Sequence, residues 1–186
     1  MKSNIRLFQL FVLSIFLCGV VGCKPSETKV VSYPPPTRTI GPADVFAALA
    51  ATNIAASSLS LPDAIYLMPT LRWIEHDFSS GLYVFQTEMG VSSWVSEAND
   101  CDKFALAASF YGKWLNYSSP NRNVSAALAI GEIYYRQGGE WSRGHAINFF
   151  VIQSGSELQI VFYEPQRRAV VTLSEVERKS VFFWKL

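Results

Sequence analysis

The stretch "HAINFFVIQSGSELQIVFYEP" (His145–Pro165) decides the fold that we expect for this chain. Two runs rich in β-branched and aromatic residues flank the short turn "SGS", a pattern that predicts a β-hairpin. In an antiparallel hairpin, the start of the first strand lies beside the end of the second. His145 and Glu164 are therefore predicted to be neighbours at one end of a sheet.

Further β-rich runs surround this hairpin, and helical patterns precede it. Residues 125–137 and 169–173 extend the sheet into an antiparallel meander, and residues 174–186 predict a short helical turn and a last strand. Apolar residues at three- and four-residue spacing predict a helix over residues 100–117. Another helix is expected from Pro42, and residues 82–89 ("LYVFQTEM") predict a strand. This order, helices and then a meander, is typical of an α+β fold.

The composition describes one globular domain. The chain has 186 residues, 49% of them hydrophobic and 17% charged, with a formal net charge of +1. That is enough apolar material for a sizeable core. Because the charges are balanced and no basic stripe is interleaved with aromatic residues, we expect no nucleic-acid partner. The sequence leaves the oligomeric state open.

The N-terminus has the layout of an export signal. A basic start, an apolar run and the ending "VVGC" resemble a bacterial lipobox, which predicts a signal peptide over residues 1–22 and lipid attachment to Cys23. Residues 23–41 are rich in Pro, Ser and Thr and predict a flexible tether. The folded domain is then expected over residues 42–186. The lipid would hold it at the bacterial cell envelope, and Lys24 after the cysteine favours the outer membrane.

Cys101 becomes the single thiol of the mature chain if Cys23 carries a lipid and the signal peptide is removed. An unpaired thiol in an oxidising compartment is either buried or kept for its reactivity. Asp100 is a good N-cap residue, so Cys101 would stand in the first turn of a helix, where the macrodipole favours a thiolate. His145 would take the thiol proton and Glu164 would orient the imidazole. The backbone N–H of Cys101 would help to stabilise an oxyanion.

Three short motifs carry a resemblance to a known family. "NDCDKFA", "RGHAIN" and "FYEPQ", in this order, resemble the papain-like cysteine peptidase domain of the fungal agglutinin family. The resemblance implies a papain-like or transglutaminase-like core and a triad of Cys101, His145 and Glu164. Asp100 and Gln166 are expected to orient that triad or the oxyanion. No metal ligands are expected. Calcium dependence follows from the resemblance alone, and Lys103 stands where the family has an acidic residue.

The function expected on these grounds is thiol-dependent hydrolysis of peptide or amide bonds in a peptide or protein substrate by an exported lipoprotein. Three alternatives stay open. A transglutaminase-like acyl transferase shares the fold and the acyl-enzyme chemistry. A cell-wall endopeptidase would need a second histidine, and the chain offers only His76. A non-catalytic envelope lipoprotein, for binding or phage exclusion, would use the same scaffold without turnover.

Overall fold

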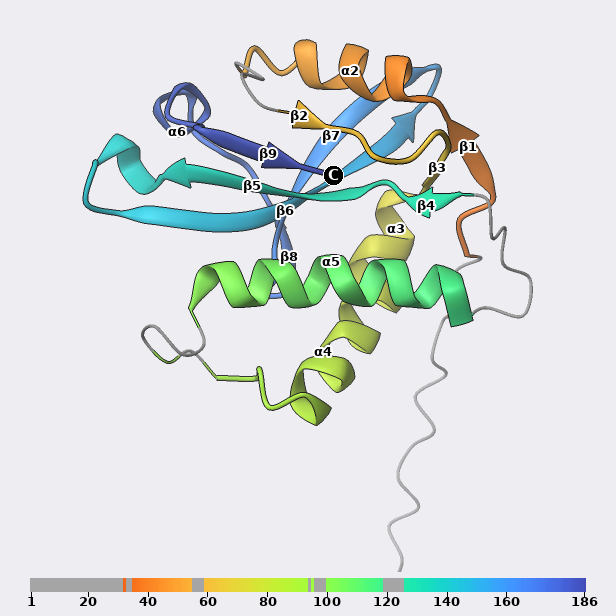
Figure 1. Ribbon diagram of the computed structural model, residues 1–186, viewed down its shortest axis with the longest axis horizontal. Helices are drawn as coiled ribbons and strands as arrows, with labels where there is room; N and C mark the ends of the chain where they lie inside the picture. Colours follow the sequence, from red (N-terminus) through yellow and green to blue (C-terminus); the bar gives the residue numbers. More distant parts are fainter. Residues whose placement is uncertain (1–31, 33–34, 55–58, 94, 96–99, 119–125) are drawn as a thin grey trace, which may run out of the picture. The chain divides into compact units, whose positions relative to one another are not determined.

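The computed structural model describes residues 32, 35–54, 59–93, 95, 100–118 and 126–186 (Figure 1). The expected signal peptide, Cys23 and most of the expected tether lie outside the described residues. Arg38–Ile40, at the end of the range expected to be tether, forms strand β1 and pairs with Tyr66–Met68, strand β3. The described fold therefore includes residues upstream of Pro42.

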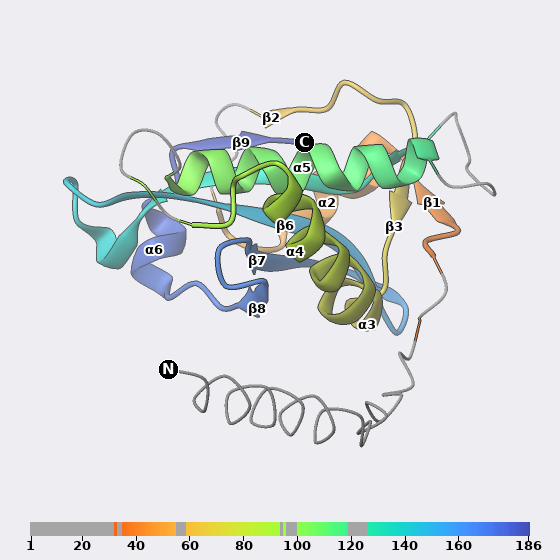
Figure 2. The same ribbon diagram turned by 90° about the horizontal axis from the view of Figure 1, so that it is seen from below.

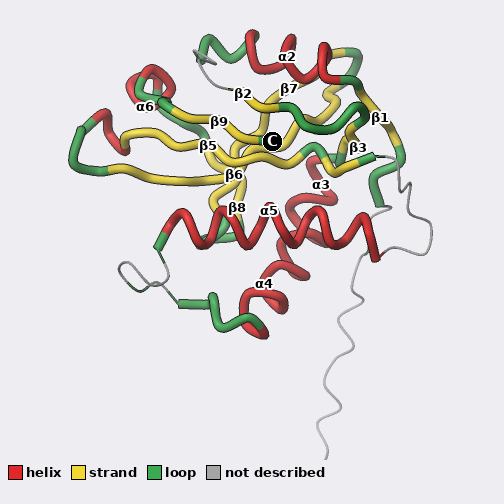
Figure 3. Tube along the Cα trace, in the orientation of Figure 1, coloured by secondary structure: helices red, strands yellow, loops and turns green. Residues whose placement is uncertain are grey.

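A six-stranded sheet forms the centre of the fold (Figure 3). Four of its five pairings are antiparallel, and only the edge strand β2 runs parallel to its neighbour. The order across the sheet is β2 (Leu59–Ser60), β9 (Phe183–Lys185), β5 (Ile130–Arg136), β6 (Gly144–Ser154), β7 (Glu157–Glu164) and β8 (Ala169–Val171). A smaller sheet has the order β1, β3 and β4 (Ala127–Leu128).

The predicted hairpin is confirmed as β6 and β7. Its pairing runs from Ser154 opposite Glu157 to Asn148 opposite Tyr163. Gly155 lies in the turn with a φ of 62°, a left-handed conformation that glycine adopts without steric cost. The meander β5–β6–β7–β8 follows the chain order, as the sequence predicts.

Helices lie on both faces of this sheet. Figures 1 and 2 show α2 on one side and the segment α3–α5 on the other. Three helical pieces of that segment follow one another directly: α3 (Leu71–Trp73), the π-helical turn η2 (Ile74–Phe78) and α4 (Ser79–Glu88). The remaining helical elements are α2 (Pro42–Ala50), α5 (Cys101–Ser118), the short 3-10 turn η3 (Gln137–Gly139) and α6 (Glu175–Lys179). The expected α+β class is confirmed.

Each face of the sheet has its own hydrophobic cluster. Towards α2, the buried residues include Leu49, Phe149 and Trp184. Towards α3–α5, the ring of Phe78 packs edge-on against Phe150, with the ring centroids 5.1 Å apart. Because successive residues of β6 point to opposite faces, its central apolar run fills both clusters. This explains why that run is continuously apolar instead of alternating.

The strand predicted over residues 82–89 is wrong, because residues 82–88 belong to α4 and Met89 is its C-cap. Phe78, Leu82 and Gln86 are buried at four-residue spacing, which is the repeat of one helix face. The adjacent Tyr83 and Val84 are both exposed, at 52% and 53%. A half-buried strand would have buried one of them. The high β-propensity of the local sequence misled the prediction, and packing on the sheet decided the outcome.

Candidate functional site

Cys101 is the first residue of α5, as the sequence predicts. The carbonyl of Asp100 accepts a hydrogen bond from the N–H of Phe104 at 3.2 Å, which is the first bond of the helix. Lys103 donates to the Asp100 carboxylate at 3.2 Å and to Asp102 at 3.1 Å. Hydrogen bonding to Asp102 and then to Lys103 lowers the pKa of Asp100. Asp100 therefore begins the helix and neutralises Lys103.

His145 and Glu164 meet at one end of the hairpin. His145 lies near the start of β6 and Glu164 at the end of β7, with Nε2 of the ring 2.6 Å from Oε2 of the carboxylate. Both side chains are largely covered, at 16% and 9% exposed. The backbone N–H of Gln166 donates to the other carboxylate oxygen at 3.2 Å. Both oxygens of Glu164 are thus engaged, and Gln166 contributes its main chain to this arrangement.

The side chain of Cys101 also acts on the charge of the His145 imidazole. Burial opposes a charge on the ring, but the interactions with Cys101 and with Glu164 outweigh it and raise the pKa of His145 to about 9. A pKa in this range favours the protonated ring at neutral pH. The structure brings together all three residues that the sequence grouped, in the order thiol, imidazole and carboxylate, an arrangement in which protons can be exchanged. The functional role of the three residues stays a prediction.

Asn148 holds the elements that carry this cluster, and sequence reasoning did not single it out. The side chain is fully buried, and its amide nitrogen lies 2.9 Å from the Ala105 carbonyl and 3.0 Å from Ser109 Oγ, both on α5. It also contacts the Gly131 carbonyl of β5 at 3.2 Å. Asn148 thereby fixes α5 against the sheet. The sequence signal for this role was a polar amide inside an otherwise apolar strand, because a buried amide needs hydrogen-bond partners.

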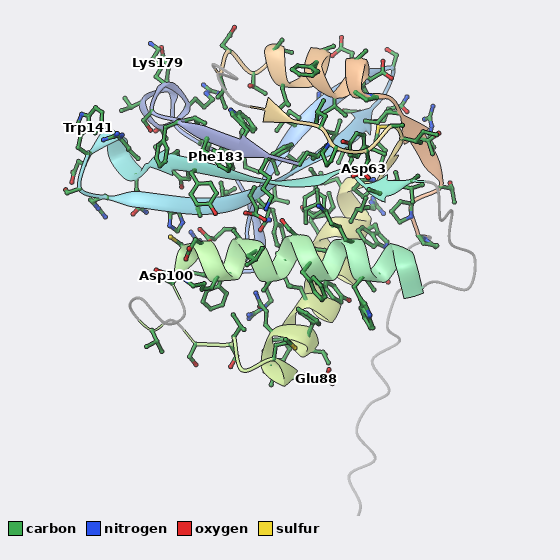
Figure 4. All side chains as sticks on the ribbon, viewed as in Figure 1. Asp63, Glu88, Asp100, Trp141, Lys179 and Phe183 are labelled. Carbon is green, nitrogen blue, oxygen red and sulfur yellow. The ribbon has the colours of Figure 1, made fainter. Side chains whose placement is uncertain are left out.

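An exposed aromatic residue stands on the connection that leads into His145. Trp141 is 83% exposed, and the guanidinium of Arg136 lies over its ring. Figure 4 shows Trp141 at the outer end of the β5–β6 connection. Phe182, half-exposed, is a second aromatic residue near Arg136. An aromatic face and a cation are therefore presented to solvent near the start of β6.

Two further properties concern the described residues alone. Within the described part of the chain, no group of three His, Cys, Asp or Glu side chains is placed to hold a metal ion. No helix in the same residues is long and apolar enough to cross a membrane. Calcium dependence was an expectation from the resemblance and stays untested.

The raised pKa of His145 predicts how stability depends on pH. The folded state binds a proton at His145 more tightly than the unfolded chain, whose pKa is near 6.5. The resulting stabilisation, at most roughly 3 kcal/mol, is complete below pH 6.5 and is lost as the pH rises through about 9. Urea unfolding from pH 6 to pH 9.5 should show this decline, and His145→Gln should flatten it. A free energy of unfolding that rises over this interval in the wild type would contradict the prediction.

Two solved structures have a fold similar to that of this chain. No family model matches this chain, and no curated protein matches it. A structure described as a PSL1a–E64 complex matches with a TM-score of 0.62 and 24% identity over 80% of this chain. A structure of Polyporus squamosus lectin bound to the human-type influenza-binding epitope Neu5Aca2-6Galb1-4GlcNAc matches with a TM-score of 0.61, also at 24% identity over 80% of this chain.

The chain spans about half the length of these two solved chains, 51% of the first and 49% of the second. At this identity the likeness establishes the fold alone. What the lectin binds is a property of that whole protein.

This finding corrects the family and the activity expected from the sequence motifs. The fold is one found in a lectin, so the assignment to a papain-like cysteine peptidase domain is wrong. These comparisons name a lectin and so contradict the expected enzyme, thiol protease and peptide or amide hydrolysis, but at 24% identity they show the fold and assign no activity to this chain. The physical reason is that a Cys, a His and a Glu in hydrogen-bonding order define a proton-sharing cluster. Such a cluster does not by itself define a reaction.

Proposed function

We propose that this chain is a non-catalytic binding module of the bacterial cell envelope and that its ligand is a carbohydrate. The observation that carries the proposal is the likeness of 80% of the chain to structures of a lectin, one of them bound to a glycan. Non-catalytic binding was one of the functions left open by the sequence. On this proposal, Cys101, His145 and Glu164 serve to hold the start of α5 against the end of the β6–β7 hairpin.

The exposed face of Trp141 gives the proposal a local candidate for ligand contact. An indole ring offers a flat apolar surface and one N–H donor, so it can stack on the apolar face of a sugar ring. Arg136, over the ring, supplies donors for sugar hydroxyls. A Trp exposed at 83% contributes little to folding, so its replacement tests ligand contact without loss of the fold.

The test is direct binding of the purified domain to an array of neutral and acidic glycans. We expect a restricted set of glycans to bind. For the best of them, Trp141→Ala should weaken affinity about ten-fold or more and leave the unfolding temperature unchanged, because the ring is exposed. Leu106→Ala, which removes a different exposed apolar side chain on α5, serves as the matched control and should leave binding unchanged.

Two outcomes would overturn the proposal. The first is the absence of binding to any glycan by a folded domain. The second is catalytic turnover of a peptide, an amide or an amine acceptor that disappears in Cys101→Ala, because a binding module needs no nucleophile. An effect of Trp141→Ala equal to that of Leu106→Ala would place the ligand contact away from the β5–β6 connection.

The expected lipid on Cys23 completes the proposal. It would hold the module at the membrane surface of the envelope, on the outer membrane if Lys24 acts as the sorting signal. The binding domain would then act on glycans within reach of the tether.

A further inference from the structure

A hollow of about 560 Å³ lies between α4 and the turn that joins β7 to β8. The hollow is wide open to solvent, and its volume lies within the range of about 300–1,000 Å³ that is usual for small-molecule sites. No motif in the sequence pointed to it, and it is separate from the exposed Trp141. Its lining residues are Ser79, Ser80, Tyr83, Val84, Arg167 and Arg168.

The charge of this hollow is one-sided. Arg167 and Arg168 line it, and none of the other lining residues is acidic. Among the residues that the structure describes, no carboxylate lies within ion-pair distance of either guanidinium. Arginine has a planar fork of donors that matches a carboxylate in a bidentate manner. Two guanidinium groups with no carboxylate paired to them among the described residues favour an anionic ligand.

Contacts within the fold hold several lining residues of the hollow in place. Arg168 has a φ of 51°, a left-handed conformation that is uncommon for a residue other than glycine, and its guanidinium lies 4.7 Å from the centre of the Tyr83 ring. Ser79 Oγ is 2.7 Å from the Ile74 carbonyl and 2.8 Å from the hydroxyl of the buried Tyr163. The backbone turn and the Tyr83 ring therefore hold Arg168 in place, and Tyr163 anchors α4 beside it.

We propose that this hollow is a binding site for the carboxylate of an acidic sugar, with Arg168 as the main contact and Arg167 as the second cation. Ser80 and the Tyr83 hydroxyl, both on the exposed side of α4, supply further polar groups for sugar hydroxyls. The proposal names a ligand class for the carbohydrate binding proposed above and rests on it. It adds a site that neither the sequence motifs nor Trp141 indicates.

The experiment compares sialyllactose with lactose, which differ by the unit that carries the carboxylate, using isothermal titration calorimetry on the full domain. We expect sialyllactose to bind at least ten-fold more tightly than lactose. Arg168→Gln should remove that preference, and Arg168→Lys should restore part of it, because an ammonium keeps the charge without the fork. Arg72→Gln, on the exposed surface of α3, is the matched control. Raising the salt concentration should narrow the preference in the wild type.

Each alternative outcome has a distinct meaning. Equal binding of the two sugars, with no effect of Arg168→Gln, overturns the acidic-sugar site and leaves the proposed function standing. Binding of neither sugar, and of no other glycan on the array, overturns both. Inorganic phosphate is the third probe. If it binds as tightly as sialyllactose and Arg168→Gln removes that affinity, the proposal of a sugar ligand is overturned and the hollow is a general anion site. Thermal unfolding of the Arg168→Gln variant shows whether losing the contact with Tyr83 destabilises the domain. It thereby separates an effect on stability from the loss of a ligand contact.

Discussion

Glu164→Gln is expected to lower the pKa of His145 from about 9 by about 1–3 units, the usual effect of removing a close opposite charge. The carboxylate lies 2.6 Å from Nε2 of the ring and is covered from solvent, so its charge is weakly screened. Glutamine keeps the size of the side chain and an oxygen for the Gln166 N–H. The substitution therefore changes the charge of the cluster and preserves its packing.

Nuclear magnetic resonance titration of the imidazole carbons measures this pKa directly. The chain has two histidines, and His76 on η2 supplies a second resonance outside the cluster. Glu175→Gln is the matched control, because it removes an exposed carboxylate that is paired with Lys179 on the surface of α6. A His145 titration that is the same in wild type and Glu164→Gln would show that the carboxylate does not set the charge of the ring.

This prediction also bears on the proposed role of the cluster. If Cys101, His145 and Glu164 hold α5 against the hairpin, then Glu164→Gln should lower the free energy of unfolding at neutral pH. It should leave glycan affinity unchanged at temperatures where the domain stays folded. A loss of glycan affinity in a fully folded Glu164→Gln variant would instead place the cluster in the ligand site.

Gly131→Ala is expected to destabilise the domain by at least about 3 kcal/mol, the upper end of the usual cost of overpacking. Gly131 lies in β5 opposite Phe149 of β6. A Cβ added there would lie 2.4 Å from the backbone carbonyl oxygen of Lys185 and 2.5 Å from the Phe149 ring. The carbonyl belongs to β9, which pairs with β5, so it cannot withdraw without loosening the sheet. Urea unfolding measures the loss.

Gly112→Ala is the matched control for Gly131→Ala. Its added Cβ would lie 2.9 Å from Cδ2 at the end of the Leu128 side chain, and 3.1 Å from Cγ2 of Ile130, a distance that a shift of a few tenths of an ångström relieves. Alanine also improves helix propensity within α5 by about 1 kcal/mol, which offsets the contact. The Gly112→Ala variant should therefore stay within about 1 kcal/mol of wild type. Equal losses at Gly112 and Gly131 would contradict the explanation by backbone contact.

A double variant keeps the Gly131 prediction testable if Gly131→Ala alone fails to fold. Phe149→Leu removes the ring contact but leaves the Lys185 carbonyl in place. Gly131→Ala combined with Phe149→Leu should therefore remain less stable than Phe149→Leu alone. Stability equal to that of Phe149→Leu would assign the whole cost to the ring.

The sequence by itself determined the hairpin and the approach of two site residues. Strand periodicity and the "SGS" turn were enough to place His145 beside Glu164, because hairpin register is a local property. A helix beginning at Cys101 was also predictable from Asp100 and from the apolar spacing that follows. The α+β class followed from the order of these elements.

Only the tertiary structure decided the features that depend on contacts between distant segments. Residues 82–89 became a helix because Leu82 and Gln86 pack on the sheet, in spite of local β-propensity. The bond between Asn148 and α5 joins residues about 40 positions apart, and no local pattern specifies such a contact. The hollow beside Arg168 arises in the same way, from the turn after β7 meeting α4. Secondary structure follows short-range periodicity. A binding surface depends on which faces meet in three dimensions, so the three motifs alone do not determine an activity.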